Sequence, residues 1–142
     1  MQTVRKSVIV ARPAATMYAL VDDCERYPEF LPWCSGAVIH ERTPSFARVT
    51  LAIDYHGLKS SISTINRNDP PELIHLDFAA GPFDHFHGHW RFVPIGAEGC
   101  RVEFALDYSF SNRAIEKVLS PVFGHIVETL VDRFVERAES PL

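Results

Sequence analysis

Cysteine is scarce in this sequence, and long hydrophobic runs are absent. The three cysteines, Cys24, Cys34 and Cys100, lie far apart and form no CxxC motif, so the sequence does not predict a structural zinc site. No stretch approaches the roughly 20 apolar residues of a membrane span. The first apolar run, residues 8–11, is much shorter than the core of a signal peptide. We therefore expect reduced thiols and a cytoplasmic location.

The sequence also lacks the common motifs of catalysis and phosphate binding. It contains no GxSxG, Walker A, GxGxxG or HExxH pattern. Its 14 basic and 18 acidic residues give a net charge of −4, so neither DNA binding nor general attraction to an anionic membrane is expected. A local basic patch stays open as an alternative. Its candidate members are Arg5, Lys6, Arg42, Arg48, Lys59, Arg67, Arg91 and Arg101.

A cluster of three carboxylates, Asp22, Asp23 and Glu25, stands at the end of a predicted helix. Negative charge is unfavourable at a helix C-terminus because the helix dipole is negative there. The cluster therefore indicates either a specific partner or plain solvated charge, and the sequence leaves both explanations open.

What the sequence does contain is enough apolar material for one domain over residues 1–142. Hydrophobic residues make up 46% of the chain, and ten phenylalanines favour a bulky aromatic core. The N-terminal part predicts a strand over residues 4–10 and a helix over residues 11–23, with Pro13 in its first turn. Residues 24–36 form an irregular aromatic segment, in which we expect a short helix around Glu29 to Leu31.

Residues 37–110 follow a period of two. In ARVTLAIDY (47–55), ELIHLDF (72–78) and RVEFALDYSF (101–110), apolar residues alternate with polar ones, and turn residues separate the runs. Strands with one buried and one solvated face are typical of an antiparallel sheet. This region, together with the first strand, predicts a sheet of about six to seven strands.

The last third of the chain changes to helical spacing. Apolar residues recur at i, i+3 and i+4 from Ile115 to Ala138, and Ser111 or Asn112 can cap the start. Ser120-Pro121 and Gly124 predict a kink or a break. A single amphipathic helix must bury its apolar stripe, and the concave face of the curved sheet is the available surface. We therefore predict an α+β fold with a cavity between helix and sheet.

The stretch GPFDHFHGHW, residues 81–90, has a histidine at every second position. His85, His87 and His89 fit a metal site, a binding surface or the solvated face of a strand. Trp90 and Phe92 lie on the opposite face, and leaving them in water would cost roughly 2 kcal/mol or more each, so they point inward. His85 and His89 are then roughly 13 Å apart, too far to share one ion. An adjacent pair with a third ligand from a neighbouring strand stays an alternative.

Four segments together resemble one known family. They are DCERYPEFLPWCSG (23–36), GPFDHFHGHWRFVP (81–94), CRVEFALDYSFSN (100–112) and FVERA (134–138). In this order they are similar to the coenzyme Q-binding, START-like family, which includes bacterial ribosome-association toxins and mitochondrial coenzyme Q-binding proteins. That family lies within the polyketide cyclase/dehydrase and lipid-transport superfamily. The resemblance implies a helix-grip fold (START/Bet v 1-like) around an apolar cavity.

The resemblance implies a binding protein without known catalysis, metal or resident cofactor. Its mitochondrial members look like binders of ubiquinone and polyisoprenoid precursors. Its bacterial members resemble proteins that bind the large ribosomal subunit and block subunit joining. The implied partners are thus a hydrophobic small molecule, such as ubiquinone or an isoprenoid, and the large ribosomal subunit, with peripheral contact at the inner membrane as a further expectation. An enzyme acting on an aromatic polyketide-like substrate is a third alternative.

Candidate ligand-binding residues come from two sources. The first source is the resemblance, in which the family's motif positions match apolar residues of segments 23–36 and 81–94. The second source is the predicted inner faces of the strands and the helix, which supply the remaining candidates. Gly88, also on the inner face, is expected to leave room for the helix or a ligand. The candidates are Tyr27, Phe30, Leu31, Trp33, Phe83, Phe86, Trp90, Phe92, Phe104, Tyr108, Phe123 and Val127.

Overall fold

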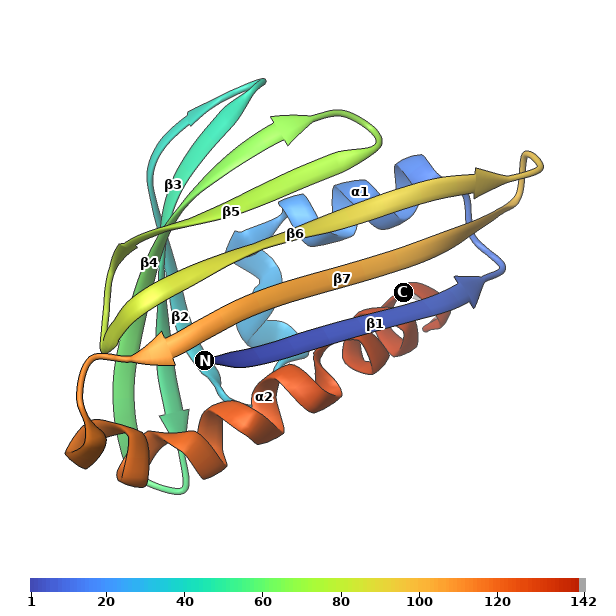
Figure 1. The fold of residues 1–142 in the computed structure, drawn as a ribbon. Helices are drawn as coiled ribbons and strands as arrows, with labels where there is room; N and C mark the ends of the chain where they lie inside the picture. Colours follow the sequence, from blue (N-terminus) through green and yellow to red (C-terminus); the bar gives the residue numbers. More distant parts are fainter. Residues whose placement is uncertain (141–142) are drawn as a thin grey trace.

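A seven-stranded antiparallel sheet curves around a long C-terminal helix (Figure 1). The structure is a computed structural model that describes residues 1–140. Its elements are β1 (Gln2–Val10), α1 (Ala14–Asp22), the 3-10 helix η1 (Cys24–Glu29), β2 (Cys34–Thr43), β3 (Phe46–Tyr55), β4 (Leu58–Asp69), β5 (Leu73–Ala80), β6 (Phe83–Ile95), β7 (Gly99–Phe110) and α2 (Arg113–Glu139). The predicted α+β class and the predicted strand number are confirmed.

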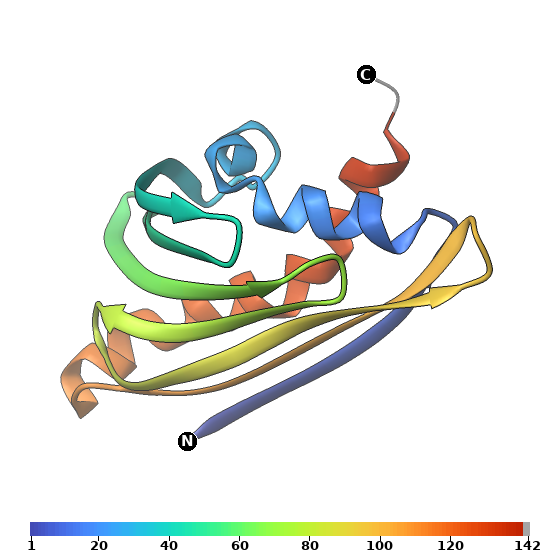
Figure 2. The ribbon, with the colours of Figure 1, turned by 90° about the horizontal axis from the view of Figure 1, so that it is seen from above.

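The strand order is β1-β7-β6-β5-β4-β3-β2, so β2 to β7 form a meander and β1 joins the free edge of β7. Register shifts interrupt the pairing of β2 with β3 between Ile39 and Glu41, and that of β6 with β7 between Phe83 and His85. Such bulges bend a strand and increase its twist. Figure 2 shows the result, in which the sheet curls around α2 while α1 and η1 close the opposite side.

The long helix α2 begins as the sequence predicts. Asn112 is the N-cap, and its side-chain oxygen accepts a hydrogen bond from the backbone N–H of Ile115 at 2.9 Å. The predicted break is wrong, because α2 runs without interruption through Pro121. Pro121 lies on the exposed side of the helix, as does Lys117 one turn earlier. The carbonyl that proline leaves without an intrahelical donor can therefore bind water.

The predicted first helix is confirmed as α1, and Pro13 lies immediately before it. The predicted short helix around Glu29 to Leu31 is misplaced, because η1 begins at Cys24 and ends at Glu29. The turn starts earlier because the backbone N–H of Arg26 donates to the carbonyl of Asp23 at 3.1 Å. The aromatic segment is therefore regular in its first half and irregular only after Glu29.

The core lies between the concave face of the sheet, α2 and α1. Every second residue of β7 from Cys100 to Phe110 is buried, as the alternation predicts. Val118, which the helical stripe includes, is 56% exposed. Gly88 also differs from expectation: a Cβ at this position would clash with the backbone carbonyl of Ala105, so the glycine makes room for β7 rather than for a ligand.

Candidate functional site

A predominantly apolar cavity of about 90 Å³ lies between α2 and the concave face of the sheet, closed on one side by η1. The helix supplies one wall and the inward side chains of β3 to β7 supply the other. The residues that line the cavity are Cys24, Tyr27, Trp33, Val49, Leu51, Ile53, Ile62, Thr64, Asn66, Leu76, Phe86, Trp90, Phe104, Leu106, Phe123, Ile126, Val127, Leu130 and Phe134. None of the lining residues carries a formal charge at neutral pH.

Aromatic contacts hold the helix wall against the sheet wall. The indole of Trp90 on β6 lies 4.6 Å from the ring of Phe104 on β7 and 5.2 Å from that of Phe134 on α2, measured between ring centroids. Phe134 also contacts Tyr27 of η1 at 5.3 Å. The two contacts of Phe134 are edge-on, and such aromatic pairs add to the stabilisation from buried area. One end of the cavity is therefore built from rings of four elements.

The titratable groups that η1 contributes to the lining are protonated at neutral pH. Burial raises the pKa of the Cys24 thiol to about 12. Burial also raises the pKa of Tyr27 well above its usual value. The Tyr27 hydroxyl donates a hydrogen bond to the backbone carbonyl of Val21, which anchors η1 to the end of α1. Neither group is an available nucleophile or base at neutral pH.

Three polar side chains interrupt the apolar lining. Thr64 and Asn66 both point inward from β4, and the Thr64 hydroxyl donates to the Asn66 side-chain oxygen at 2.8 Å. Asn66 is the single buried polar residue among residues 1–140, with 8% of its surface exposed. The indole N–H of Trp33 is buried and has no hydrogen-bond partner in the described chain. These groups, together with the Trp90 indole and the Tyr27 hydroxyl that is bonded to Val21, are the polar side-chain groups of the lining that could orient a ligand.

The structure places seven of the twelve predicted site residues in the lining. They are Tyr27, Trp33, Phe86, Trp90, Phe104, Phe123 and Val127. They converge because inward positions of adjacent strands face the helix stripe, so residues distant in sequence share one wall. Their contact with a ligand stays a prediction.

The other five candidates, Phe30, Leu31, Phe83, Phe92 and Tyr108, lie outside the lining. Phe92 and Leu31 are fully buried, and Phe92 packs on Tyr18 with ring centroids 5.7 Å apart. Phe30 lies behind Phe134, at 5.2 Å, and its other side faces the guanidinium of Arg137. Packing against neighbours thus uses up the faces that these three side chains could offer to a ligand.

Phe83 and Tyr108 lie toward the N-terminal end of α2, and both pack around Phe123. Their ring centroids are 5.0 Å and 4.8 Å from that of Phe123. Phe83 also stacks on Phe110 at 5.0 Å and borders a second, much smaller cavity of about 10 Å³. That space is about large enough for one water molecule.

Sequence reasoning missed twelve lining residues. Most are inward positions of β3 and β4 or belong to the stripe of α2, so alternation and helical spacing could have identified them. Thr64 and Asn66 gave no such signal, because β4 carries polar residues on both faces. The missed residues are Cys24, Val49, Leu51, Ile53, Ile62, Thr64, Asn66, Leu76, Leu106, Ile126, Leu130 and Phe134.

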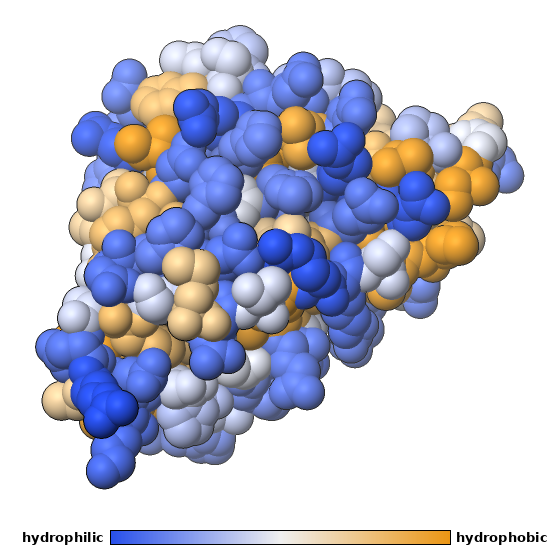
Figure 3. Space-filling model, viewed as in Figure 1, coloured by the Kyte–Doolittle hydropathy of each residue, from blue (hydrophilic) through white to orange (hydrophobic). Residues whose placement is uncertain are grey.

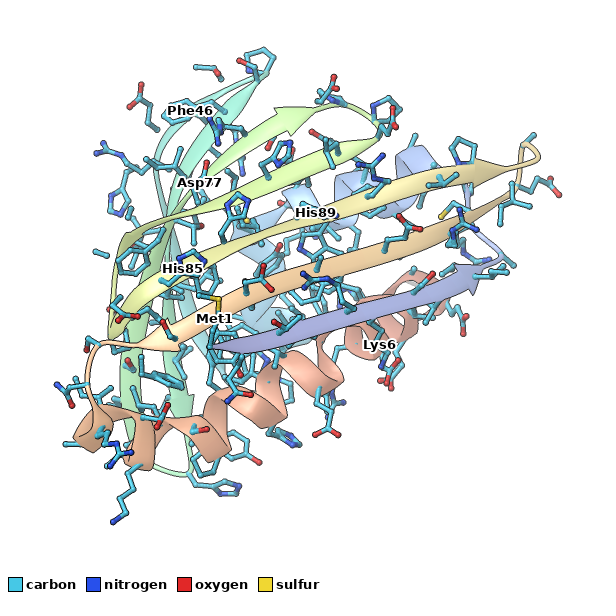
Figure 4. All side chains as sticks on the ribbon, in the orientation of Figure 1. Met1, Lys6, Phe46, Asp77, His85 and His89 are labelled. Carbon is cyan, nitrogen blue, oxygen red and sulfur yellow. The ribbon has the colours of Figure 1, made fainter. Side chains whose placement is uncertain are left out.

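The histidines of β6 lie on the outer face of the sheet, as predicted. His85 and His87 are exposed and His89 is half-buried, and Figure 4 labels His85 and His89 on β6. Phe86, which lies between His85 and His87, and Trp90, which follows His89, are buried. His87 interacts with Asp77 of β5 at 3.0 Å between Nδ1 and the carboxylate. Among the described residues, no three His, Cys, Asp or Glu side chains are grouped so that they could hold a metal ion. The metal interpretation therefore has no structural support within residues 1–140.

The candidate basic patch is interrupted by acidic neighbours. Seven of its eight members form ion pairs; Lys59 is the exception within the described chain. The carboxylates of these pairs are those of Glu25, Glu41, Glu72, Asp77, Glu103, Asp107 and Asp132.

The face of the molecule shown in Figure 3 is mainly hydrophilic, and its hydrophobic residues gather at the end formed by the β6–β7 hairpin. Exposed Ile9 and Ile95 belong to the strands at that end.

The carboxylate cluster near the end of α1 has partners within the chain. Glu25 accepts two hydrogen bonds from the guanidinium of Arg42, at 2.8 and 3.1 Å. Asp23 pairs with Arg26 at 3.1 Å, and Asp22 accepts from the Asn68 amide at 2.9 Å. The cluster thus ties η1 and α1 to β2 and β4.

Comparison with known proteins identifies the family to which this chain belongs. The family model described as polyketide cyclase / dehydrase and lipid transport matches residues 10–135. The chain belongs to this family. Within the polyketide cyclase/dehydrase and lipid transport family, it is 34% identical to the ribosome association toxin RatA of Escherichia coli over 139 residues, which are 98% of this chain and 88% of that protein. It is 26% identical to the coenzyme Q-binding protein COQ10 homolog B of Xenopus laevis over 131 residues, 86% of this chain and 52% of that protein.

Solved structures share the family's fold across almost the whole chain. A START superfamily protein from Mycobacterium smegmatis superposes with a TM-score of 0.79 and 25% identity, covering 96% of this chain and 97% of that one. The Zhui aromatase/cyclase from Streptomyces sp. R1128 superposes with a TM-score of 0.85 over 97% of this chain and 93% of that one. Its sequence identity of 19% shows a common fold and does not assign an activity. The described part of the chain has no helix that is long and apolar enough to span a membrane.

Proposed function

We propose that this protein binds an uncharged, lipid-like small molecule, such as ubiquinone or an isoprenoid, in the cavity between α2 and the sheet. The observation that carries the proposal is the 90 Å³ cavity, whose lining is apolar apart from a few neutral polar groups. Apolar pockets with a few polar groups are the usual sites for small molecules. We place this role in the cytoplasm, with peripheral contact at the inner membrane when the ligand is collected or delivered.

The size of the cavity limits what it holds in this conformation. About 10–15 Å³ of cavity volume suffices for one water molecule. The 90 Å³ space therefore accommodates several waters or one ring-sized group, but not a long isoprenoid chain. A quinone-like head can enter, and a long tail requires α2 or η1 to move outward.

The chemistry of the lining supports binding rather than catalysis. A cyclase that moves protons needs a group that can gain or lose one near neutral pH. The cavity has no His, Asp, Glu, Lys or Arg in its lining, and burial keeps Cys24 and Tyr27 protonated. We therefore propose a carrier or chaperone of its ligand.

Mass spectrometry of the lipid extracted from the purified protein tests this function. We expect a quinone or isoprenoid in the wild type and much less of it in the Trp90→Ala variant, which removes the centre of the aromatic wall. Val118→Ala is the matched control, because this α2 side chain is exposed. The proposal fails if the extract holds no such ligand and the delipidated protein takes none up.

A second candidate is association with the large ribosomal subunit. The 34% identity to the protein named ribosome association toxin RatA favours it, and this similarity extends over 98% of the chain. The ion pairs of the basic residues argue against strong phosphate binding, since seven of the eight members of the candidate patch already have an acidic neighbour. Binding to the large subunit would then depend on shape complementarity and on contacts with ribosomal proteins, as well as on contacts with RNA.

Sedimentation through a sucrose gradient tests the second candidate. The protein should migrate with isolated large subunits at low salt. A binding affinity that decreases only weakly as salt is added would indicate few phosphate contacts. Small subunits in a parallel gradient are the control. Migration only at the top of both gradients at low salt rejects ribosome association.

A further inference from the structure

Two polar groups in the cavity have hydrogen-bonding capacity that the chain does not use. The indole N–H of Trp33 is buried without an acceptor. The Asn66 side chain makes one hydrogen bond in the described chain, in which its oxygen accepts from Thr64, so its amide N–H groups have no protein acceptor. Both residues line the cavity and are more than nine-tenths buried.

A buried donor without a partner, such as the Trp33 indole N–H, is costly in an apolar setting. A buried N–H that has left water without finding an acceptor carries its full desolvation penalty. Most buried polar groups in folded proteins are paired for this reason. Val or Leu at position 66 of β4 would form the same wall without polar groups, whereas the Asn66 amide offers N–H donors to an acceptor that enters the cavity.

From these donors we propose that the cavity selects a neutral, ring-sized ligand that carries carbonyl or ether oxygens, and that Asn66 and Trp33 orient it. This inference rests on the proposed ligand-binding function and narrows it. A bare hydrocarbon or isoprenoid chain offers no acceptor and leaves both donors unpaired. An anionic lipid is excluded because the lining has no cation to balance its charge.

The two donors come from different parts of the wall. Asn66 lies on β4, and Trp33 immediately precedes β2. A ring with acceptors on more than one edge can therefore meet both, whereas a single terminal oxygen meets one. The hydrogen bond from Thr64 occupies the Asn66 oxygen, so the amide N–H groups are the part of this side chain left for a ligand.

Equilibrium dialysis of the delipidated full-length protein against two matched probes tests the inference. Tetramethyl-1,4-benzoquinone and 1,2,4,5-tetramethylbenzene have the same ring and methyl groups and differ in the two carbonyls. We expect the quinone to bind up to about a hundredfold more tightly than the hydrocarbon, since each of the two hydrogen bonds contributes up to about tenfold in affinity. Asn66→Leu, close to isosteric, should reduce this preference by up to about tenfold while leaving hydrocarbon affinity unchanged.

Trp33→Phe is the second, independent variant, which keeps a ring and removes only the N–H. It should reduce quinone affinity by up to about tenfold and decides the question if Asn66→Leu fails to fold. Ser63→Ala is the matched control, because Ser63 lies on the outer face of β4 and bonds Thr50 there. Equal binding of both probes, or an unchanged preference in both variants, overturns the inference and leaves the apolar carrier intact. Binding of neither probe overturns both.

Discussion

The ring of Phe134 on α2 meets the indole of Trp90 on β6 edge-on, with centroids 5.2 Å apart and planes at 73°. Phe134 also contacts Tyr27 and Phe30, at 5.3 and 5.2 Å. One side chain therefore joins the helix, the sheet and the aromatic segment at a single point of the cavity wall.

Phe134→Ala should lower the free energy of unfolding by about 3–5 kcal/mol, because it removes a fully buried ring and enlarges an existing cavity. Urea denaturation followed by far-UV circular dichroism measures this change. The exposed Val118→Ala on the same helix is the control and should change stability by less than about 0.5 kcal/mol. Equal effects of the two substitutions would show that α2 does not pack on the sheet through Phe134.

A second prediction concerns two glycines with opposite surroundings. Gly88→Ala should destabilise the protein by about 1–3 kcal/mol, because its Cβ meets the Ala105 carbonyl of the neighbouring strand. Gly124 lies within α2, and a Cβ there meets nothing within 4 Å. Gly124→Ala should therefore stabilise the helix, by roughly 0.5–1 kcal/mol. Thermal and urea unfolding of both variants test the pair, and a loss of stability at position 124 as large as at 88 would refute this account.

The sequence predicts the faces of the strands well because side-chain direction in a strand is a local property. In β7 and β6 each inward position carries an apolar residue except Gly88, so alternation alone assigns Phe104, Leu106 and Trp90 to the interior. The prediction of a break at Pro121 failed because the cost of a proline depends on which side of the helix faces water. That side is set by packing, which the local sequence does not show.

The polar groups of the site could not be found in the same way. The β4 sequence LKSSISTINRND has polar residues at both inward and outward positions and therefore shows no period. The side chains of Thr64 and Asn66 point inward because the register of β4 pairs these residues with the buried Val49 and Ala47 of β3. The donors that we propose to orient the ligand are thus a tertiary feature, whereas the aromatic wall follows from sequence pattern.

The pH dependence of stability provides a third prediction, centred on His89. Burial, together with Arg91, His75 and Arg5 nearby, lowers the pKa of His89 below its usual 6.5, while Glu103 opposes this effect. The unfolded state therefore binds more protons than the folded state just below pH 6.5, and stability falls as the pH falls through this range. His89→Gln should lose less stability on acidification than the wild type. Urea unfolding of both proteins at about pH 8 and about pH 5 tests this, and parallel losses would contradict it.

The last prediction concerns the outer face of β6 as a whole. Replacing His85, His87 and His89 together by Gln should change the free energy of unfolding by less than about 1 kcal/mol, because His85 and His87 are exposed, His89 is only half-buried, and polar substitutions and ion pairs at exposed sites contribute little. Quinone uptake in the dialysis experiment should also be unchanged, since the rings point away from the cavity that Trp90 and Phe86 line. Gln at position 87 can still donate to Asp77, which now pairs with His87. Loss of uptake, or release of a metal ion detected by mass spectrometry, would place function on the outer face and contradict the assignment of the cavity as the site.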